Sequence, residues 1–304
     1  MKLAIRMPDH LGDATMALAA LRSLLDRHPG ATVHGPRLLA DLLAATSMPA
    51  STLRPGNEVP DADVGVLLKP SFHAAWRWRH LPRRVGLAAN GRALLLTDPV
   101  PARPDEHRRD AYGRVARAAL ALAEPTASRA AGDPRSVGHP TQPTGGFIAL
   151  NPWSPTPTVR WPHFRALAEA LARDHEVRFY AGPGEEAHVR AIAGPHPLVA
   201  GLSLPDFALN LAGAALFVTN DSGAGHFADA VGVPVLMIHG STNPALTGTG
   251  EAITGGPIWC GPCYRKTCVL GLGCLTRIGP DVVAARVRAM LAADAQKCAL
   301  APGP

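Results

Sequence analysis

Residues 216–244 carry the clearest chemical signal in the sequence. They read LFVTNDSGAGHFADAVGVPVLMIHGSTNP, a pattern that predicts a strand, a turn at 220–223, a helix and a second strand, the unit of a parallel α/β sheet. The turn follows the carboxyl end of a strand, where open α/β sheets bind ligands. The first amides of a helix attract phosphate, and His226 could donate to the same anion. The alternative is that Asp221 or Ser222 only caps the helix and that His226 is a core residue.

The rest of the sequence must supply elements that position this turn. Strands are predicted at 2–7, 30–34 and 62–68, and they alternate with helices at 14–27, 38–45 and 106–123. A stretch rich in Pro, Gly, Ser and Thr at 124–146 indicates an interdomain linker. Strands and helices then alternate again from 147, ending in a helix at 281–293. We therefore expect an α/β protein with domains at 1–145 and 146–304.

Composition narrows the class of partner. The chain has 304 residues and a net charge of +6, which favours a negatively charged partner. No apolar run is long enough to cross a membrane, and the N-terminus lacks the pattern of a signal peptide. We expect a cytoplasmic protein, with peripheral attachment to the inner face of a membrane left open.

Five motifs in order resemble one family, the ADP-heptose:lipopolysaccharide heptosyltransferases of glycosyltransferase family 9. They are LGDATMALAALRSL at 11–24, KPSFHAAW at 69–76, NPWSPTPTVRWP at 151–162, NDSGAGH with GSTNP at 220–244, and CGPCYRKTC with a later Cys, Ile, Pro and Val at 260–283. The resemblance implies a GT-B architecture, in which two Rossmann-like domains face each other across a cleft. It also implies that the second domain holds an ADP-heptose donor, that the first holds the acceptor, and that transfer inverts the anomeric centre without a metal ion or other cofactor.

Asp13 is the candidate catalytic base. Inverting transfer needs a carboxylate that removes the proton of the acceptor hydroxyl, and Asp13 matches the Asp to which the family assigns this role. The loop after the first strand would direct Asp13 into the cleft. The alternative is that Asp13 caps a helix that begins at Ala14.

The donor-binding candidates come from the two central motifs and from the turn near residue 185. The family often has a Glu at that turn that contacts the ribose. The full set is Ser154, Thr156, Arg160, Glu185, Asp221, Ser222, Gly223, His226 and Thr242. One position departs from the family, which has a Lys two residues before the Trp-Pro pair where this chain has Val159. Either Arg160 takes over the phosphate contact or the donor pocket is altered.

A basic group in the first half fits an acidic acceptor. The candidates are Lys69, Arg83, Arg84 and Arg92, because Arg suits bidentate contacts with carboxylates and phosphates. The family's acceptors carry acidic sugars and phosphates, so we expect an acidic or phosphorylated glycan or small molecule, with contact to a membrane surface left open. The group lacks the interleaved aromatic residues of a nucleic-acid platform, so no nucleic-acid partner is expected.

Four cysteines are spaced as CxxC-x4-C-x5-C at Cys260, Cys263, Cys268 and Cys274. Such spacing alone is typical of a structural zinc site, but the family has similar cysteines without being a metalloenzyme family in general, and we expect metal-free structural thiols with zinc as the alternative. Two other function classes also stay open. One is a sugar-nucleotide epimerase on the same fold, and the other is a non-catalytic protein that binds nucleotide sugars.

Overall fold

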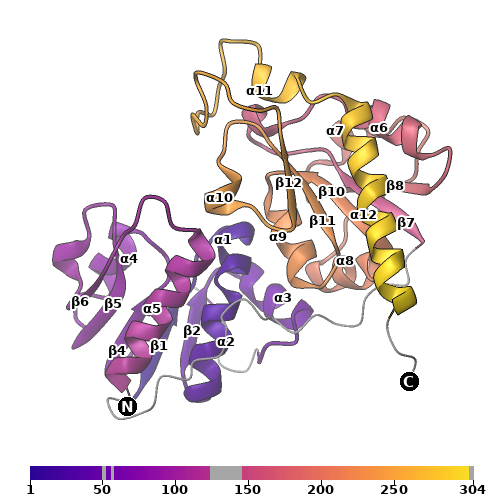
Figure 1. Cartoon of the computed structure of the whole chain (residues 1–304). Coiled ribbons are helices and arrows are strands. Elements are labelled where there is room, and N and C mark those ends of the chain that lie inside the picture. Colours follow the sequence, from indigo (N-terminus) through magenta and orange to yellow (C-terminus); the bar gives the residue numbers. More distant parts are fainter. Residues whose placement is uncertain (50–52, 56–57, 124–145, 301–304) are drawn as a thin grey trace. The chain divides into compact units, whose positions relative to one another are not determined.

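The computed structural model describes residues 1–49, 53–55, 58–123 and 146–300. Figure 1 shows the chain, which divides into two compact units. Unit 1 is Met1–His139 with Ala245–Thr247, and unit 2 is Pro140–Pro244 with Gly248–Pro304. The expected linker at 124–146 lies outside the described residues except at its last position, so its structure and the expected boundary at 145/146 stay predictions.

Unit 1 contains one parallel sheet of six strands in the order β3-β2-β1-β4-β5-β6. The strands are β1 (Leu3–Arg6), β2 (Thr32–Gly35), β3 (Leu53–Pro55), β4 (Val64–Leu67), β5 (Arg83–Ala88) and β6 (Asp98–Pro101). The helices are α1 (Leu11–Met16), α2 (Leu18–Arg27), α3 (Leu38–Ala45), α4 (Phe72–Arg77) and α5 (Arg108–Ala123), with a 3-10 turn, η1, at Ala93–Leu95. This is the Rossmann strand order. Successive strands are added on one side of β1 up to β3 and then on its other side from β4, and such sheets bind ligands at this switch point between β1 and β4.

The first helical segment differs from the prediction at its start. A single helix was expected from Ala14 to Arg27, whereas the structure has α1 from Leu11 and then α2. The amide of Ala14 already donates to the carbonyl of His10 at 2.9 Å, so residues 11–13 form the first helical turn. Leu18, Leu21 and Leu25 of α2 lie three and four residues apart and are buried, so they form the apolar face of this helix.

Unit 2 repeats the same architecture. Its sheet has the order β12-β11-β10-β7-β8-β9, which is the unit 1 order read from the other edge, and all its pairings are parallel. The strands are β7 (Phe147–Asn151), β8 (Glu176–Ala181), β9 (Leu198–Ala200), β10 (Ala214–Asn220), β11 (Val235–His239) and β12 (Glu251–Thr254). The helices are α6 (Phe164–Leu171), α7 (Glu186–Ala193), α8 (Leu204–Leu211), α9 (Gly223–Ala230), α10 (Pro244–Thr247), α11 (Gly273–Thr276) and α12 (Pro280–Leu300), with η2 at Pro157–Val159.

The central strands of unit 2 are buried on both faces. Side chains of a strand alternate between faces, so Ile148 and Leu150 of β7 pack in the cluster with α6, α7 and α12, while Phe147 and Ala149 pack with α8 and α9. Both faces are therefore covered, as parallel sheets require. Figure 1 shows α12 running beside α6 and α7.

Gly225 sets the distance between α9 and the sheet. A Cβ atom there would lie 2.5 Å from Cε of Met237 and 2.7 Å from Cγ2 of Thr219. Only glycine allows this close approach of helix and strands. The first turn of α9 is thereby held against the ends of β10 and β11.

Candidate functional site

The predicted donor residues of unit 2 gather at one edge of its sheet. β8, β7, β10 and β11 are neighbours in that order, and all are parallel, so their carboxyl ends lie together. The residues that follow these ends are Glu185 after β8, Ser154, Thr156 and Arg160 after β7, Asp221, Ser222, Gly223 and His226 after β10, and Thr242 after β11. The strand order reverses between β7 and β10, which makes this edge the expected ligand site.

A buried amide network fixes the loops at this edge. The side chain of Asn220 donates to the carbonyl of Pro152 at 2.8 Å and accepts from the amide of Trp161 at 2.8 Å. Asn151 donates to the carbonyl of Tyr180 at 3.0 Å, and the hydroxyl of Thr219 donates to Asn151. Asn151, Thr219 and Asn220 were not among the predicted site residues. Their polar types inside otherwise apolar strands were the available signal, because buried polar groups need partners.

The start of α9 is built to leave its first amides facing the edge. Ser222 occupies the N-cap position with an extended backbone, but its side chain makes no cap bond, and its hydroxyl instead lies 3.0 Å from that of Thr219. The alternative of a side-chain cap by Ser222 is therefore not seen. The first amides of a helix have no intrahelical partner and carry the positive end of its dipole, so this position suits a phosphate oxygen.

Two histidines flank the carboxylate of Asp221. The Nε2 atom of His226 lies 4.0 Å from Oδ1, and the Nδ1 atom of His239 lies 3.7 Å from Oδ2. Both histidines are buried. Burial lowers the pKa of His239, although the Asp221 carboxylate acts in the opposite direction. His226 thus packs as the core alternative expects, while it also lies one turn into the helix that the anion would meet.

Arg160 is held in a fixed position by an aromatic face. Its guanidinium lies over the ring of Trp153, 3.5 Å from the centroid, and its Nε donates to the carbonyl of Ser154. The other partner of Trp153 is His188, whose ring stacks at 3.9 Å between centroids. Burial lowers the pKa of Arg160, and the carboxylate of Glu185 opposes that shift. Arginine stacked in this way loses little further freedom when it binds an anion.

Val159 and Arg160 differ in environment although they are adjacent. Val159 is 5% exposed, whereas Arg160 is half-buried. The position at which the family has a Lys is therefore a core position in this chain, and the nearest cation of the motif is Arg160.

Glu185 is engaged by its own loop. Its Oε2 accepts from the amide of Gly182 at 2.9 Å, and a Cβ atom at Gly182 would lie 3.0 Å from that oxygen. Gly182 is thus the residue that lets the loop close around the carboxylate. The position is compatible with a ribose contact through the other oxygen, which stays a prediction.

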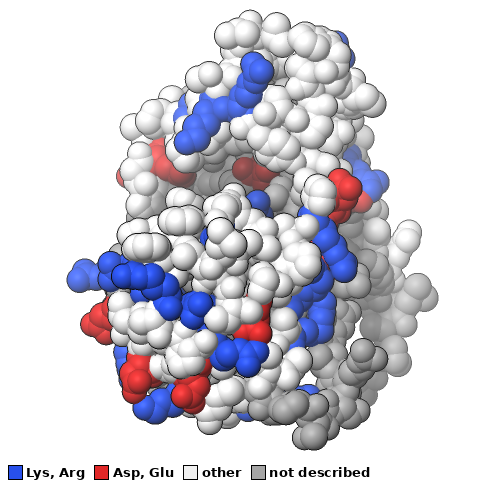
Figure 2. Space-filling model, turned by 90° about the vertical axis from the view of Figure 1, so that its left-hand side faces the viewer, with Lys and Arg blue, Asp and Glu red and all other residues white. Residues whose placement is uncertain are grey.

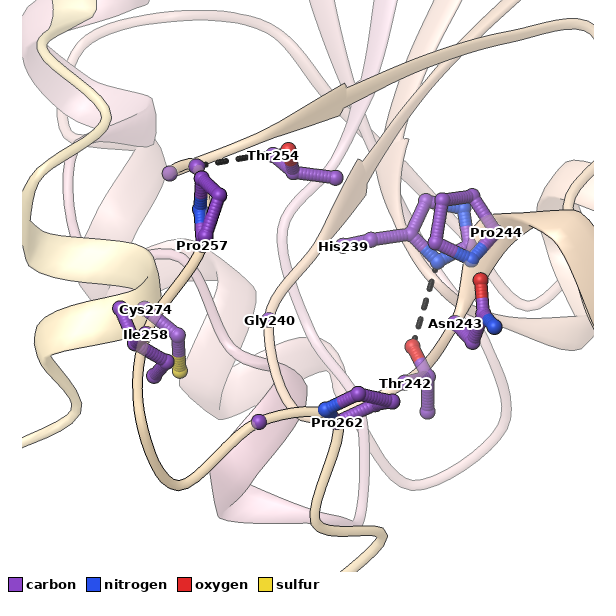
Figure 3. A pocket seen from close by; sticks show the side chains of 13 residues that line it. His239, Gly240, Thr242, Asn243, Pro244, Thr254, Pro257, Ile258, Pro262 and Cys274 are labelled. Atoms are coloured by element: carbon purple, nitrogen blue, oxygen red, sulfur yellow. Dashed lines mark hydrogen bonds between the residues drawn. The ribbon is translucent and has the colours of Figure 1, made fainter.

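A pocket of about 290 Å³ lies beside the end of β11 (Figure 3). Its polar lining includes His239, Thr242, Asn243 and Thr254, with Cys274 on the opposite side. The Nδ1 atom of His239 lies 3.2 Å from the hydroxyl of Thr242. Of the predicted donor residues only Thr242 lines this pocket, so the pocket adjoins the α9 start without containing it.

Asp13 of unit 1 lies in the first turn of α1 and does not cap that helix. The N-cap is His10, and the Asp13 carboxylate instead accepts from Nη1 of Arg108, on α5, at 3.3 Å. The side chain of Asp13 is 28% exposed. Next to this pair lies the buried phenol of Tyr112, whose pKa is raised by burial and then by the Asp13 charge. The capping alternative for Asp13 is thus wrong, and a cation orients its carboxylate.

Lys69 follows β4 and meets a carboxylate from the neighbouring strand end. Its ammonium pairs with Asp9, which also accepts from Nη2 of Arg6 at 2.8 Å. Burial acts against the charge of Asp9, but the hydrogen bond from Lys69 and the contacts with Arg6 outweigh it, and the pKa of Asp9 falls. Asp9 is a charged residue of this loop that was not among the predicted site residues. Lys69 remains partly exposed beside it.

The three predicted acceptor arginines are differently placed. Arg83 makes a two-pronged ion pair with Asp98, and Arg84 donates to the carbonyls of Leu81 and Leu95. Arg92 is fully buried. Its guanidinium donates to backbone carbonyls of Leu87 at 2.8 Å, Lys69 at 2.6 Å and Leu67 at 3.4 Å.

Burial lowers the pKa of Arg92 to about 10. The structure therefore corrects its expected role: Arg92 offers no surface to an acceptor and joins β4, β5 and the turn between β5 and η1. Arg83 and Arg84 stay acceptor candidates only through the donors that these contacts leave.

The four cysteines do not form a metal centre in this structure. All four are free thiols, and no group of three or more His, Cys, Asp or Glu side chains in the described ranges could hold a metal ion. The choice between metal-free thiols and zinc stays a prediction, since Cys260, Cys263 and Cys268 all lie close enough to Cys274 to affect its charge. The amide of Leu270 donates to the sulfur of Cys268 at 3.4 Å and lowers the pKa of that thiol, whereas burial raises the pKa of Cys274.

Among the described helices, none is both long and apolar enough to span a bilayer. Comparison with known proteins identifies a family model, "Glycosyltransferase family 9 (heptosyltransferase)", that matches residues 58–272. A lipopolysaccharide heptosyltransferase 1 from Pseudomonas aeruginosa is 35% identical over 161 residues, which are 45% of this chain and 45% of that protein. The matched part thus spans less than half of that relative.

Solved structures share the fold of the whole chain. An ADP-heptose lipopolysaccharide heptosyltransferase II from E. coli is 22% identical, covers 97% of this chain and 99% of its own, and has a TM-score of 0.71. The iron-containing dodecameric glycosyltransferase TibC from enterotoxigenic E. coli is 15% identical, covers 96% of this chain and 76% of its own, and has a TM-score of 0.65. These likenesses and the two parallel sheets identify the fold as GT-B, as the motifs predicted.

Proposed function

Because the chain belongs to glycosyltransferase family 9, the heptosyltransferases, we propose that it transfers a heptose or a related sugar from an ADP-sugar to a hydroxyl of a glycan or small-molecule acceptor. The observation that carries the proposal is the start of α9 at the strand-order reversal of unit 2, whose preceding residue Asn220 is hydrogen-bonded to the amide that follows Arg160. That edge offers helix amides and a fixed cation to a diphosphate.

In the proposed reaction Asp13 acts as the base. Its carboxylate removes the proton of the acceptor hydroxyl while that oxygen attacks the anomeric carbon from the side opposite the diphosphate. The bond between the anomeric carbon and the phosphate oxygen breaks, ADP leaves, and the configuration inverts. The contact with Arg108 orients the carboxylate that this step needs. Such general-base catalysis contributes about two to four orders of magnitude.

The charge that develops on the leaving diphosphate needs stabilisation. In the proposal this falls to the α9 amides, His226 and Arg160, with Glu185 at the ribose and Thr242 near the sugar. Because these groups supply positive charge and donors, we propose that transfer needs no metal ion. Unchanged initial rates in EDTA would agree with this, and a loss restored by one metal would contradict it.

On the acceptor side the proposal keeps Lys69 as the main contact, because it remains partly exposed at the strand-order reversal of unit 1. Arg83 and Arg84 are secondary candidates. An acceptor with carboxylate or phosphate groups suits these cations.

Two measurements test the function. Calorimetry with ADP, UDP, GDP and dTDP should show ADP bound most tightly, and a clear preference for another nucleotide would refute the ADP donor. Incubation of ADP-heptose with the protein should release ADP only when an acceptor is present, and NMR of the product should show inversion. An epimerised sugar nucleotide formed without acceptor would favour an epimerase, and tight binding without any turnover would favour a binding protein.

A further inference from the structure

The segment 257–277 of unit 2 exposes large apolar side chains that the proposed chemistry does not use. Trp259 is 88% exposed and Val269 is 90% exposed, and Leu270 is also exposed. Single exposed apolar residues are common on soluble proteins, but groups of them mark interaction surfaces. Trp259 adjoins Cys260 in the sequence, and Val269 adjoins Cys268. Both cysteines lie close enough to Cys274 to influence its charge, so the exposed apolar residues project from one small region of the surface.

The same segment is entirely basic in its charge. No Asp or Glu occurs from 252 to 280, while Arg265, Lys266 and Arg277 do, and all three are exposed. Figure 1 places this segment at the left of unit 2, near α11. Figure 2 views that side and shows a ridge of Lys and Arg side chains among uncharged residues at its top.

The segment is anchored at its base. The amide of Tyr264 donates to the carbonyl of Ser241 at 2.9 Å, and the amide of Asn243 donates to the Tyr264 hydroxyl at 3.3 Å. The hydroxyl of Thr158 donates to the carbonyl of Arg265. The exposed side chains are therefore presented from a base tied to the β7 and β11 loops, which reduces the entropy lost when they bind a surface.

We propose that the segment 257–277 docks on an anionic membrane surface. Trp259, Val269 and Leu270 enter the interfacial layer, where indole rings and short apolar groups are favoured. Arg265 and Lys266 contact lipid phosphates, which matches the absence of acidic residues. An acidic protein partner would use the same cations but would leave the lipid vesicles of the test below unbound. The proposal does not depend on the transferase activity.

Sedimentation with vesicles tests the proposal. The full chain, kept in reductant so that Cys268 cannot link two copies, should bind vesicles of phosphatidylglycerol and phosphatidylethanolamine and bind phosphatidylcholine much more weakly. The double variant Arg265→Gln/Lys266→Gln should lower the partition coefficient about 30-fold, since each cation near such a surface contributes about fivefold. The matched control Arg173→Gln/Arg190→Gln, on exposed positions of the same unit, should change it little.

The apolar contribution is tested in the same way. Trp259→Ser and Val269→Ser should each weaken vesicle binding, whereas Leu209→Ser, at a position 76% exposed on α8, should not. Fluorescence quenching by brominated lipids then locates the contact. Quenching should disappear in Trp259→Phe. It should persist in the control Trp76→Phe, because Trp76 is a half-exposed indole of unit 1 and lies outside the proposed segment.

Three results would overturn the proposal. The first is equal binding to neutral and anionic vesicles, or none to either. The second is quenching that disappears with Trp76 in place of Trp259. The third is a change of oligomeric state in the segment variants without a change in vesicle binding, which would make a second copy of the chain the occupant.

Discussion

Replacement of Asp13 by Asn separates catalysis from folding because Asp13 is not a helix cap. The capping explanation predicts little change from an Asn, which can also cap, but the N-cap is His10 and the Asp13 carboxylate instead accepts from Arg108. Asn keeps the size and one acceptor oxygen of Asp. It cannot accept a proton at neutral pH, so the substitution removes the base with little change in shape.

The expected magnitudes differ enough to be told apart. Loss of the base should lower turnover by about two to four orders of magnitude, or about 3–5.5 kcal/mol in activation free energy. The folded state loses a partly exposed ion pair, worth about 0.2–1 kcal/mol, and an acidic residue in a first helical turn, worth about 0.3–1 kcal/mol. Unfolding free energy should therefore fall by less than about 2 kcal/mol, and most of the protein stays folded.

The assay compares three quantities in one preparation: initial rates of ADP release at saturating ADP-heptose and acceptor, the dissociation constant of ADP by calorimetry, and the urea midpoint. Asp26→Asn is the control, because Asp26 is an exposed carboxylate on α2. Near-normal turnover in Asp13→Asn with an intact fold would remove Asp13 from the mechanism. A loss confined to ADP affinity would make it a binding residue instead.

Three further predictions concern the donor cation, the buried arginine and pH. Arg160→Ala should weaken ADP binding about 10- to 100-fold in calorimetry, as a lost charged hydrogen bond does. Trp153→Leu should weaken it about two- to fivefold through the lost cation–π contact. If both variants bind ADP as tightly as the unsubstituted protein, the Arg160–Trp153 stack is not part of the donor site. Arg92→Ala should lower the unfolding free energy in urea by about 2–4 kcal/mol, since three carbonyls lose their donor, two of them in buried hydrogen bonds, and an unchanged midpoint would contradict its structural role. Burial depresses the pKa of His34 and His239 below 6.5, so the unfolded chain binds more protons at these two positions. The unfolding free energy should therefore fall as pH drops below about 6.5, by up to about 1.4 kcal/mol per pH unit for each histidine. His34→Gln should flatten this slope, and an unfolding free energy that rises on acidification would refute the assignment.

The sequence predicted the central strands of both sheets but not their edges. Runs such as 147–150 and 235–238 are apolar throughout because both faces of a central parallel strand are buried. The edge strands β3, β9 and β12 have three or four residues, and β6 contains two prolines, so no local pattern marks them. β5 escaped prediction because it begins with Arg83 and Arg84, whose charges indicated a binding surface rather than a strand.

The parts of the site that are formed by residues adjacent in the sequence were predictable. The parts that depend on which strands pair in the sheet were not. The turn after β10 follows from a strand, small residues and a helix start, all adjacent in the sequence. Arg92 is different, because its carbonyl partners at Leu67 and Lys69 precede it by more than twenty residues. Asp9 and Lys69 meet across sixty positions only because β1 and β4 are neighbours. Charge alone could not tell a buried arginine from a binding one.

The proposed exchange of roles between residues 159 and 160 has a physical explanation in the turn that contains them. Residues 157–159 form a 3-10 turn, in which successive side chains are about 120° apart. A side chain at 159 that points into the core therefore leaves its neighbour at 160 free to point elsewhere. The turn is fixed on both sides, by Asn220 at the amide of Trp161 and by Thr158 at the carbonyl of Arg265, so it cannot rotate to expose residue 159. Given that constraint, an apolar residue at 159 contributes to packing, and a cation can serve the edge only from 160, where Trp153 holds it.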